Sequence, residues 1–425
     1  MLIRVFYTLV LTLAAPLLLF GLYKSKPNKP KFGPRWKEHF GFTPSLTSNG
    51  RPLWIHAVSV GECIAAIPLI KELKERNPEQ TIVVTTTTST GCEQIEKLGD
   101  LVEHRYMPID FSFAVRGFLK AVNPEKMLII ETELWPNTLH TVHSAGIPIV
   151  VINARLSEKS CQNYARVQPL FNLLSPCLSK VLCQSQADAD RFARLGVNLE
   201  QLETTGSIKF DIQISDVIKQ KGKELRNKLG NDRPVWIAAS THKGEDEQVL
   251  AAHLEVLKQH PNALLILVPR HPERFDSVFE LGKSFGVNSV KRTSNDSVTS
   301  EAQVYLGDTM GEMLVLMGAA DICFMGGSLL GGKVGGHNVL EPAALGMPII
   351  SGPSYFNFQE IVSLMSKDTA INIVNNSTQL AEKVTLLLTD ASLRAGQTQK
   401  LTKIVAMNSG SISSTLRHLL AVGKN

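Results

Sequence analysis

Short, continuous apolar runs recur along the chain and are separated by stretches with helical periodicity. In the first half of the chain these runs lie at residues 53–58, 81–84, 127–130, 147–152 and 181–183. The stretch at 64–75, between the first two runs, has apolar side chains three and four residues apart, as an amphipathic helix does. A strand that is apolar on both faces belongs to a parallel sheet covered by helices on both sides. The pattern therefore predicts a doubly wound α/β domain.

The same alternation starts again after a polar stretch at residues 211–233. The second set of apolar runs lies at residues 235–239, 264–268, 304–306, 322–325 and 348–350. A chain of 425 residues is also longer than one hydrophobic core usually serves. We therefore expect two Rossmann-like domains, at residues 51–210 and 211–425. Their ligand should bind in the cleft between them, beyond the carboxyl ends of the strands.

The N-terminal region carries an uncharged, leucine-rich stretch at residues 5–23. As a helix it would be about 28 Å long, close to the ~30 Å hydrocarbon core of a bilayer. It is longer than the apolar run of a cleavable signal peptide, and lysines follow it directly. We expect residues 1–23 to be a retained anchor that spans the membrane or lies in its interface, and residues 24–50 to be a basic linker. By the positive-inside rule, the rest of the chain stays in the cytoplasm.

The charge distribution argues against a nucleic-acid-binding protein, and the cysteine spacing argues against a zinc protein. The net charge is +5, and part of the excess lies in one cluster formed by Lys24, Lys26, Lys29, Lys31, Arg35 and Lys37. A nucleic-acid interface would need basic clusters interleaved with aromatic residues, so we expect no nucleic-acid partner. The six cysteines are scattered through apolar stretches without the spacing of a zinc site, and we expect buried, reduced thiols.

A glycine-rich segment at residues 326–337 follows the predicted strand 322–325, and a helix should begin near Asn338. Glycines let backbone amides approach a phosphate closely, and a helix N-terminus adds free N–H groups and a positive dipole end. Glu341, one turn into this helix, could accept hydrogen bonds from ribose hydroxyls. The segment predicts a nucleotide phosphate site, and a flexible surface loop is the alternative.

Other polar groups follow strands of the predicted second domain. Arg270 comes after the run at 264–268, where a guanidinium suits a phosphate or a nucleobase. Residues 307–312 end another strand, and their backbone could contact a base. Residues 240–245, which include Lys243, end the first strand. The alternatives are an exposed loop arginine for Arg270 and a solvated cap for residues 240–245.

Carboxylates follow two strands of the predicted first domain. Glu62 lies at a helix start beyond the strand 53–58, where a general base would be needed; an ordinary first-turn acid is the alternative. Glu131 and Glu133 close the strand 127–130, and a period of two places them on the same side. Such a pair must be protonated, paired or bound to a ligand, so either a catalytic carboxylate or a metal site would explain it. Lys209 could neutralise a leaving phosphate, pair with Glu131, or be a plain surface lysine.

An Asp-x-Asp pattern, by which some glycosyltransferases hold a metal, occurs at Asp188 and Asp190. The pattern is incidental by our interpretation, because residues two apart on a helix face different ways. Phosphate charge should then be met by Arg270, Lys209 and helix ends. We therefore expect metal independence, no metal site and no cofactor.

Six segments together carry a family resemblance, at residues 56–62, 132–137, 153–157, 206–211, 269–272 and 335–342. Through them the chain closely resembles the Kdo (3-deoxy-D-manno-octulosonic acid) transferases of lipopolysaccharide assembly over essentially its whole length. The resemblance implies a GT-B fold, the donor CMP-Kdo, and inversion at the anomeric carbon. It also implies an inner-membrane acceptor, the acylated disaccharide precursor of lipid A (lipid IVA). The chain departs locally from the family pattern at residues 329–334.

The resemblance also implies roles for individual residues. Glu62 matches the proton acceptor, and Glu131 and Lys209 match the transition-state stabilisers. The implied CMP contacts are Pro269, Arg270, Met310, Gly311, Glu312, Asn338, Val339, Leu340 and Glu341. Two alternatives stay open: another GT-B nucleotide-sugar enzyme, such as a UDP-GlcNAc transferase or epimerase, and a membrane-tethered nucleotide-binding scaffold without catalysis.

Overall fold

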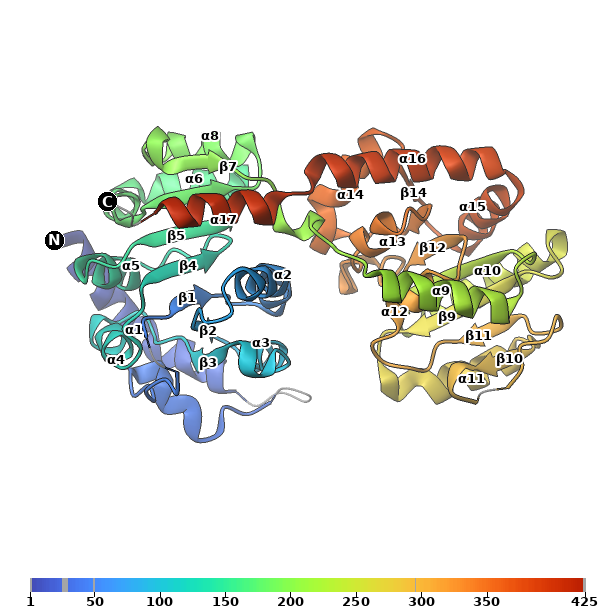
Figure 1. Cartoon of the computed structure of the whole chain (residues 1–425), viewed down its shortest axis with the longest axis horizontal. Coiled ribbons are helices and arrows are strands. Elements are labelled where there is room, and N and C mark those ends of the chain that lie inside the picture. Colours follow the sequence, from blue (N-terminus) through green and yellow to red (C-terminus); the bar gives the residue numbers. More distant parts are fainter. Residues whose placement is uncertain (1, 25–29, 49, 295, 423–425) are drawn as a thin grey trace. The chain divides into compact units, whose positions relative to one another are not determined.

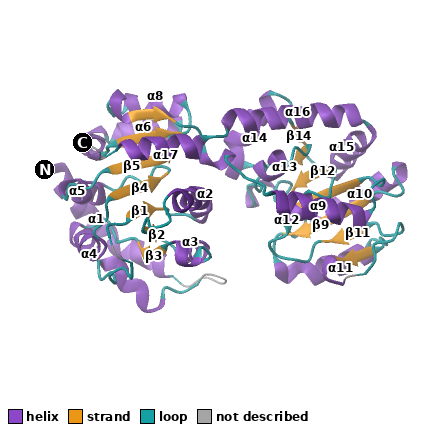
Figure 2. Ribbon diagram, in the orientation of Figure 1, coloured by secondary structure: helices purple, strands orange, loops and turns teal. Residues whose placement is uncertain are grey.

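The protein consists of two compact units (Figure 1). This computed structural model describes residues 2–24, 30–48, 50–294 and 296–422. The first unit comprises Met1–Asp211 and Asn408–Asn425, and the second comprises Ile212–Met407. Each unit is built on one seven-stranded parallel sheet with helices packed around it (Figure 2). The doubly wound α/β architecture expected from the sequence is confirmed.

The sheet of the first unit has the strand order β3-β2-β1-β4-β5-β6-β7. The strands are β1 (Leu53–His56), β2 (Ile82–Thr86), β3 (Glu103–Tyr106), β4 (Lys126–Ile130), β5 (Ile149–Ala154), β6 (Lys180–Cys183) and β7 (Leu202–Thr204). Alternate residues enter two different cores: Trp54 and Ile129 lie in one, Ile55 and Ile130 in the other. Both faces of the sheet are therefore buried, which explains the continuous apolar runs.

The helices of the first unit begin at polar caps in several places, as at Ser59, Ser157 and Ser185. The α-helices are α1 (Leu2–Tyr23), α2 (Val60–Arg76), α3 (Ser89–Glu96), α4 (Ser112–Val122), α5 (Pro136–Ser144), α6 (Glu158–Arg166), α7 (Gln168–Leu174), α8 (Gln186–Arg194) and α17 (Ser411–Ala421). Short 3₁₀ helices accompany them, among them η1 (Gly33–Phe40) and η5 (Ile208–Phe210). Among the linker residues, 25–29 (with Lys26 and Lys29) and 49 lie outside the described residues.

The last helix, α17, belongs to the first unit, although we expected residues 408–425 in the second domain. Ile412, Leu416 and Leu419 are buried in the core on one face of the first sheet. The carboxylate of Asp211 accepts hydrogen bonds from the amides of Gly410 (2.5 Å) and Ile412 (2.5 Å) at the start of the helix. The chain therefore leaves the first unit at Asp211 and returns to it at Asn408.

The sheet of the second unit has the order β10-β11-β9-β8-β12-β13-β14. Its strands are β8 (Val235–Thr241), β9 (Leu264–Pro269), β10 (Ser289–Lys291), β11 (Val304–Leu306), β12 (Ile322–Met325), β13 (Ile349–Ser351) and β14 (Ile371–Ile373). Its helices are α9 (Asp216–Leu229), α10 (Asp246–Gln259), α11 (Phe275–Ser284), α12 (Met313–Met317), α13 (Leu340–Ala344), α14 (Gln359–Lys367), α15 (Ser377–Thr389) and α16 (Ala391–Asn408).

Strand order reverses between β1 and β4 in the first sheet and between β8 and β12 in the second. In open α/β sheets, ligands bind beyond the carboxyl ends of the strands at such switch points. The loops that follow these four strands are therefore the places to look for function. These loops carry Glu131, His242 and the glycine-rich segment, and Glu62 lies in the first turn of α2, just after the loop that follows β1.

Candidate active site

Glu62 lies at the start of α2, directly beyond β1, and is 7% exposed. Its Oε1 accepts a hydrogen bond from Ser59 Oγ (2.7 Å), and its Oε2 accepts one from the amide of Val58 (2.8 Å). Burial raises the pKa of Glu62; these hydrogen bonds oppose the rise, and the negative charges of Glu131 and Glu133 add to it. The site therefore holds a fixed carboxylate that is a stronger base than an exposed glutamate.

Glu131 and Lys209 form an ion pair in the same unit. Lys209 Nζ donates to Glu131 Oε1 at 2.9 Å, which is the pairing that the sequence left open. Glu131 has a φ of 61°, a left-handed conformation that is uncommon for residues other than glycine. Lys209 lies in η5, and the amide of its neighbour Ile208 donates to the side chain of the buried Asn153. Unusual backbone of this kind clusters at functional sites.

Glu133 has a different partner from Glu131, because its Oε2 accepts from Trp135 Nε1 at 3.0 Å. The prediction that both carboxylates lie on one side assumed that the strand continues through Glu133, and this assumption was wrong. Strand β4 ends at Ile130, and the positive φ of Glu131 breaks the extended conformation before Glu133 is reached. Each carboxylate instead has its own hydrogen-bond donor.

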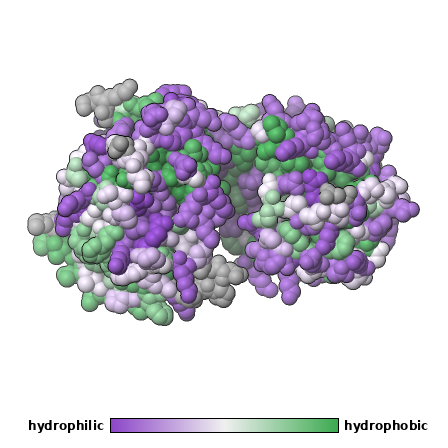
Figure 3. Space-filling model, turned by 60° about the horizontal axis from the view of Figure 1, so that its bottom comes forward, coloured by the Kyte–Doolittle hydropathy of each residue, from purple (hydrophilic) through white to green (hydrophobic). Residues whose placement is uncertain are grey.

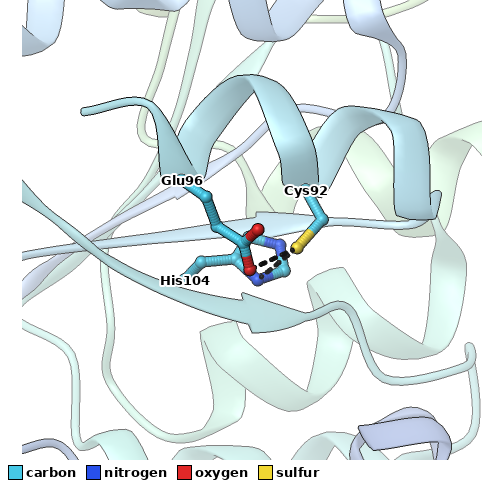
Figure 4. Close-up of side chains that lie close together, drawn as sticks. All are labelled: Cys92, Glu96 and His104. Atoms are coloured by element: carbon cyan, nitrogen blue, oxygen red, sulfur yellow. Dashed lines mark hydrogen bonds between the residues drawn. The ribbon is translucent and has the colours of Figure 1, made fainter. Parts of the chain in front are cut away.

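A cluster of possible metal ligands lies elsewhere, formed by Cys92, Glu96 and His104 with ligand atoms within 4.8 Å of one another (Figure 4). The guanidinium of Arg35, from η1, already occupies it: Nη2 is 2.8 Å from His104 Nδ1, and Nη1 is 3.4 Å from Glu96 Oε1. A cation at that place repels a metal ion. Burial also raises the pKa of the Cys92 thiol to about 11, so it is not a thiolate at neutral pH. The cluster therefore holds η1 against the first unit. In the sequence, the spacing of Cys92, Glu96 and His104 does not match a zinc-binding pattern.

In the second unit, Glu245 lies between β8 and α10, and its side chain binds the start of the glycine-rich segment after β12. It is fully buried and accepts from the amides of Gly327 (2.6 Å), Ser328 (3.0 Å) and Leu329 (3.0 Å). Gly326 permits this packing, because a Cβ there would lie 2.7 Å from the carbonyl oxygen of Ser240. We expected the amides of this segment to be available to a phosphate, and for these three that expectation was wrong. Sequence reasoning missed Glu245, which it treated as a possible solvated cap.

Residues 338–341 form the turn into α13, which begins at Leu340. Asn338 Oδ1 accepts from the amide of Leu340 (3.1 Å), and Asn338 Nδ2 donates to Glu341 Oε1 (3.2 Å). Burial raises the pKa of Glu341, whereas Asn338 and the positive charge of Arg270 lower it. Val339 and Leu340 are almost fully buried, whereas Asn338 and Glu341 are partly exposed and are the members of this turn that a nucleotide could contact.

Three histidines gather around Arg270 at the ends of β8, β9 and the glycine-rich segment. His242 Nε2 is 2.8 Å from His337 Nε2, and the ring centroids of His242 and His271 are 5.4 Å apart. Burial, the other two histidines and Arg270 lower the pKa of His337 to about 4, so the ring is neutral at pH 7. None of these histidines was predicted from the sequence as a site residue. Neutral N–H groups beside an arginine suit a negatively charged ligand.

The remaining predicted nucleotide contacts follow β9 and β11. Pro269 is the buried last residue of β9. Met310 is 64% exposed, and Gly311 has a φ of 80°. The carboxylate of Glu312 is bound by Arg292 Nε (3.2 Å) and Nη2 (3.1 Å), which lowers its pKa. Backbone groups and the Met310 side chain are therefore the accessible contacts of this turn.

Comparison with known proteins assigns the family. A model of the 3-deoxy-D-manno-octulosonic-acid transferases (Kdo transferases) matches residues 34–212. The chain is also 40% identical to the 3-deoxy-D-manno-octulosonic acid transferase of Haemophilus influenzae over 382 residues, which are 89% of each protein. The chain belongs to the Kdo transferase family. It shares 33% identity with the corresponding transferase of Bordetella pertussis over 83% of this chain and 84% of that protein.

Solved structures agree with the fold of this Kdo transferase. The UDP-GlcNAc 2-epimerase of Neisseria meningitidis matches with a TM-score of 0.57 at 15% identity, covering 87% of this chain and 100% of that one. A glycosyltransferase from Rickettsia africae matches with a TM-score of 0.53 at 15% identity, covering 88% of this chain and 98% of that one. At this identity the likeness concerns the fold alone, and it confirms a GT-B architecture.

Proposed function

We propose that this Kdo transferase moves Kdo from CMP-Kdo to a hydroxyl of lipid IVA, with inversion at the anomeric carbon. The buried carboxylate of Glu62 is the observation that supports this reaction most directly. It lies at the switch point of the first sheet, and its pKa is raised by burial. A base whose pKa lies closer to the working pH removes a proton from a hydroxyl more effectively.

In the proposed reaction, Glu62 takes the proton of the acceptor hydroxyl as its oxygen attacks C2 of Kdo. The bond from C2 to the phosphate oxygen breaks, and CMP leaves with the electron pair. The sugar passes through an oxocarbenium-like state, whose positive charge a nearby carboxylate such as Glu131 favours. Lys209, 2.9 Å from Glu131, orients that carboxylate and supplies a positive charge for the leaving phosphate.

The second unit binds the CMP part of the donor in this proposal. The cluster of Arg270, His242, His271 and His337 suits the phosphate, and the turn at 338–341 suits the ribose. With these groups meeting the negative charge, the reaction proceeds without a metal or a cofactor. The acylated disaccharide acceptor lies in the inner membrane, where α1 anchors the protein with its catalytic units in the cytoplasm. The length and apolar character of α1 support this localisation.

Incubation of the full-length protein with CMP-Kdo and tetra-acylated lipid A precursor tests the proposal. Mass spectrometry should show a product heavier by one or more Kdo residues, and NMR of the new linkage should show the inverted configuration. UDP-GlcNAc serves as the control donor and should give no product. Turnover of UDP-GlcNAc with none of CMP-Kdo would overturn the proposed donor, and a retained configuration would overturn the mechanism.

A further inference from the structure

Hydrogen bonds hold one face of α1 against the first unit. We call this contact, formed by Tyr7 and Thr8 of α1 with Asp110 and Asn137, the polar clasp. Tyr7 Oη donates to Asp110 Oδ2 at 2.8 Å, and Asn137 Nδ2 donates to Thr8 Oγ1 at 3.0 Å. Asp110 is 5% exposed, and its carboxylate also accepts from the amides of Asn137 (3.2 Å) and Thr138 (2.6 Å). The same face of α1 packs against α5 and α7. The clasp is therefore part of the folded unit.

The other end of α1 is fastened as well. Tyr23 Oη lies 2.7 Å from His39 Nδ1, and its ring packs edge-on against Phe32 with centroids 5.4 Å apart. Leu22 and Tyr23 also pack on a small core that contains Phe32 and Tyr106. Tyr7 and Tyr23 are separated by about 24 Å along the helix axis at the usual rise per residue. The helix therefore lies along the surface of the unit over most of its length.

The opposite face of α1 is apolar and exposed. Its large side chains, each at least 59% exposed, are Leu2, Phe6, Leu9, Leu13, Leu17 and Phe20. We call this set the outer stripe; in Figure 3 apolar surface appears at the edge of the unit that carries α1. At the C-terminal end of the helix, Lys24, the exposed Lys31 and the 45% exposed Trp36 surround a pocket of about 230 Å³. Tryptophan and lysine are the residues that favour the headgroup level of an anionic bilayer.

We propose that α1 does not cross the bilayer but lies in its plane, with the outer stripe among the acyl chains and the inner face on the first unit. This inference rests on the proposed membrane attachment. Were α1 to stand across the membrane with its clasp intact, the part of the first unit that carries Asp110 and Asn137 would have to enter the hydrocarbon core with it. Lipid-exposed loops and charged groups are costly there. Because the first unit covers the inner face of α1, that face need not be charged, which explains why composition alone fits a spanning helix.

The location of the N-terminus distinguishes the two arrangements. A short hydrophilic extension with one cysteine is added before Met1 of the full chain, and membranes are treated with an impermeant maleimide. The six native cysteines are all buried, so the added thiol is the one that reacts. Labelling in inverted vesicles and none in spheroplasts is expected. Labelling from the periplasmic side would overturn the in-plane arrangement but leave the membrane attachment intact, whereas a protein recovered in the soluble fraction would overturn both.

A cross-link in intact membranes tests the clasp itself. The double variant Thr8→Cys/Asn137→Cys should form a disulfide on mild oxidation, because these side chains are in hydrogen-bond contact. Leu13→Cys/Asn137→Cys is the matched control, since Leu13 belongs to the outer stripe and is 83% exposed. The control should give at least tenfold less cross-linked product. Equal yields for the two pairs, or none for the first, would show that α1 leaves the first unit in the membrane.

Discussion

Replacement of Glu245 by Gln changes the hydrogen bonding at the start of the glycine-rich segment. Glu245 Oε1 accepts from the amides of Ser328 (3.0 Å) and Leu329 (3.0 Å), and Oε2 accepts from those of Gly327 (2.6 Å) and His242 (3.3 Å). A glutamine oxygen can serve one of these two pairs. Its NH₂ group then faces the other pair of N–H donors, which lose their acceptor inside a fully buried site.

The two unpaired amides set the size of the effect. Each buried N–H without an acceptor costs about 1–3 kcal/mol, which gives about 2–6 kcal/mol for two. The neutral side chain recovers part of this, because burial disfavours the charged form of Glu245 and raises its pKa. We therefore expect a net loss of about 2–4 kcal/mol, smaller than the typical stability of a domain. The variant should fold, with the segment less well fixed.

Urea denaturation and calorimetric titration with CMP measure the two consequences. Glu247→Gln is the matched control, because Glu247 is exposed and accepts from the amide of Gly244 (3.1 Å) at the surface. Its effect on stability should stay within about 0.5 kcal/mol. Glu245→Gln should also weaken CMP binding, since the segment follows β12 into the proposed nucleotide site. Stability equal to that of the control, together with unchanged CMP affinity, would refute the reasoning.

Four further outcomes concern the chemistry. Glu62→Gln should lower kcat by about 10²–10⁴ while the Kd of CMP is unchanged, and a kcat within threefold of the native value would remove Glu62 as the base. The pKa of Glu62 is raised, so kcat/KM should begin to fall, as the pH is lowered, at a pH above the range in which an ordinary carboxylate is protonated. A kcat/KM that stays constant down to that range would contradict a base with a raised pKa. Lys209→Met should lower kcat about 10-fold to 1000-fold yet change stability by less than about 1 kcal/mol, since its ion pair is partly exposed. Turnover should be undiminished in excess EDTA, and a loss restored by a divalent ion would show that a metal takes part.

The central strands could be predicted from the sequence because they are buried on both faces. The predicted run at 127–130 corresponds to β4 (Lys126–Ile130), and the run at 264–268 corresponds to β9. The edge strands could not be found in this way. In β3 (Glu103–Tyr106) buried and partly exposed residues alternate, and β10 (Ser289–Lys291) is partly exposed throughout. Such strands leave no continuous apolar run.

Candidate site residues could be predicted where their position just after a strand was enough to identify them. Glu62 and Arg270 follow strands directly, and the structure places both beyond strand ends. Contacts between distant segments were beyond reach: Glu245 lies 82 residues from Gly327, and His242 lies 95 residues from His337. The return of α17 to the first unit was likewise not predicted, since residues 211–425 were expected to form one domain.

The return of the chain to the first unit has a consequence for biosynthesis. The second unit, Ile212–Met407, is inserted into the first, so the ribosome must complete it before α17 exists. At about 5–20 residues per second, the nascent first unit waits roughly 10–40 s for Ile412, Leu416 and Leu419 to cover its core. During that interval its uncovered face is available to chaperones or to aggregation. Translation speed across the insert should therefore affect the yield of folded protein.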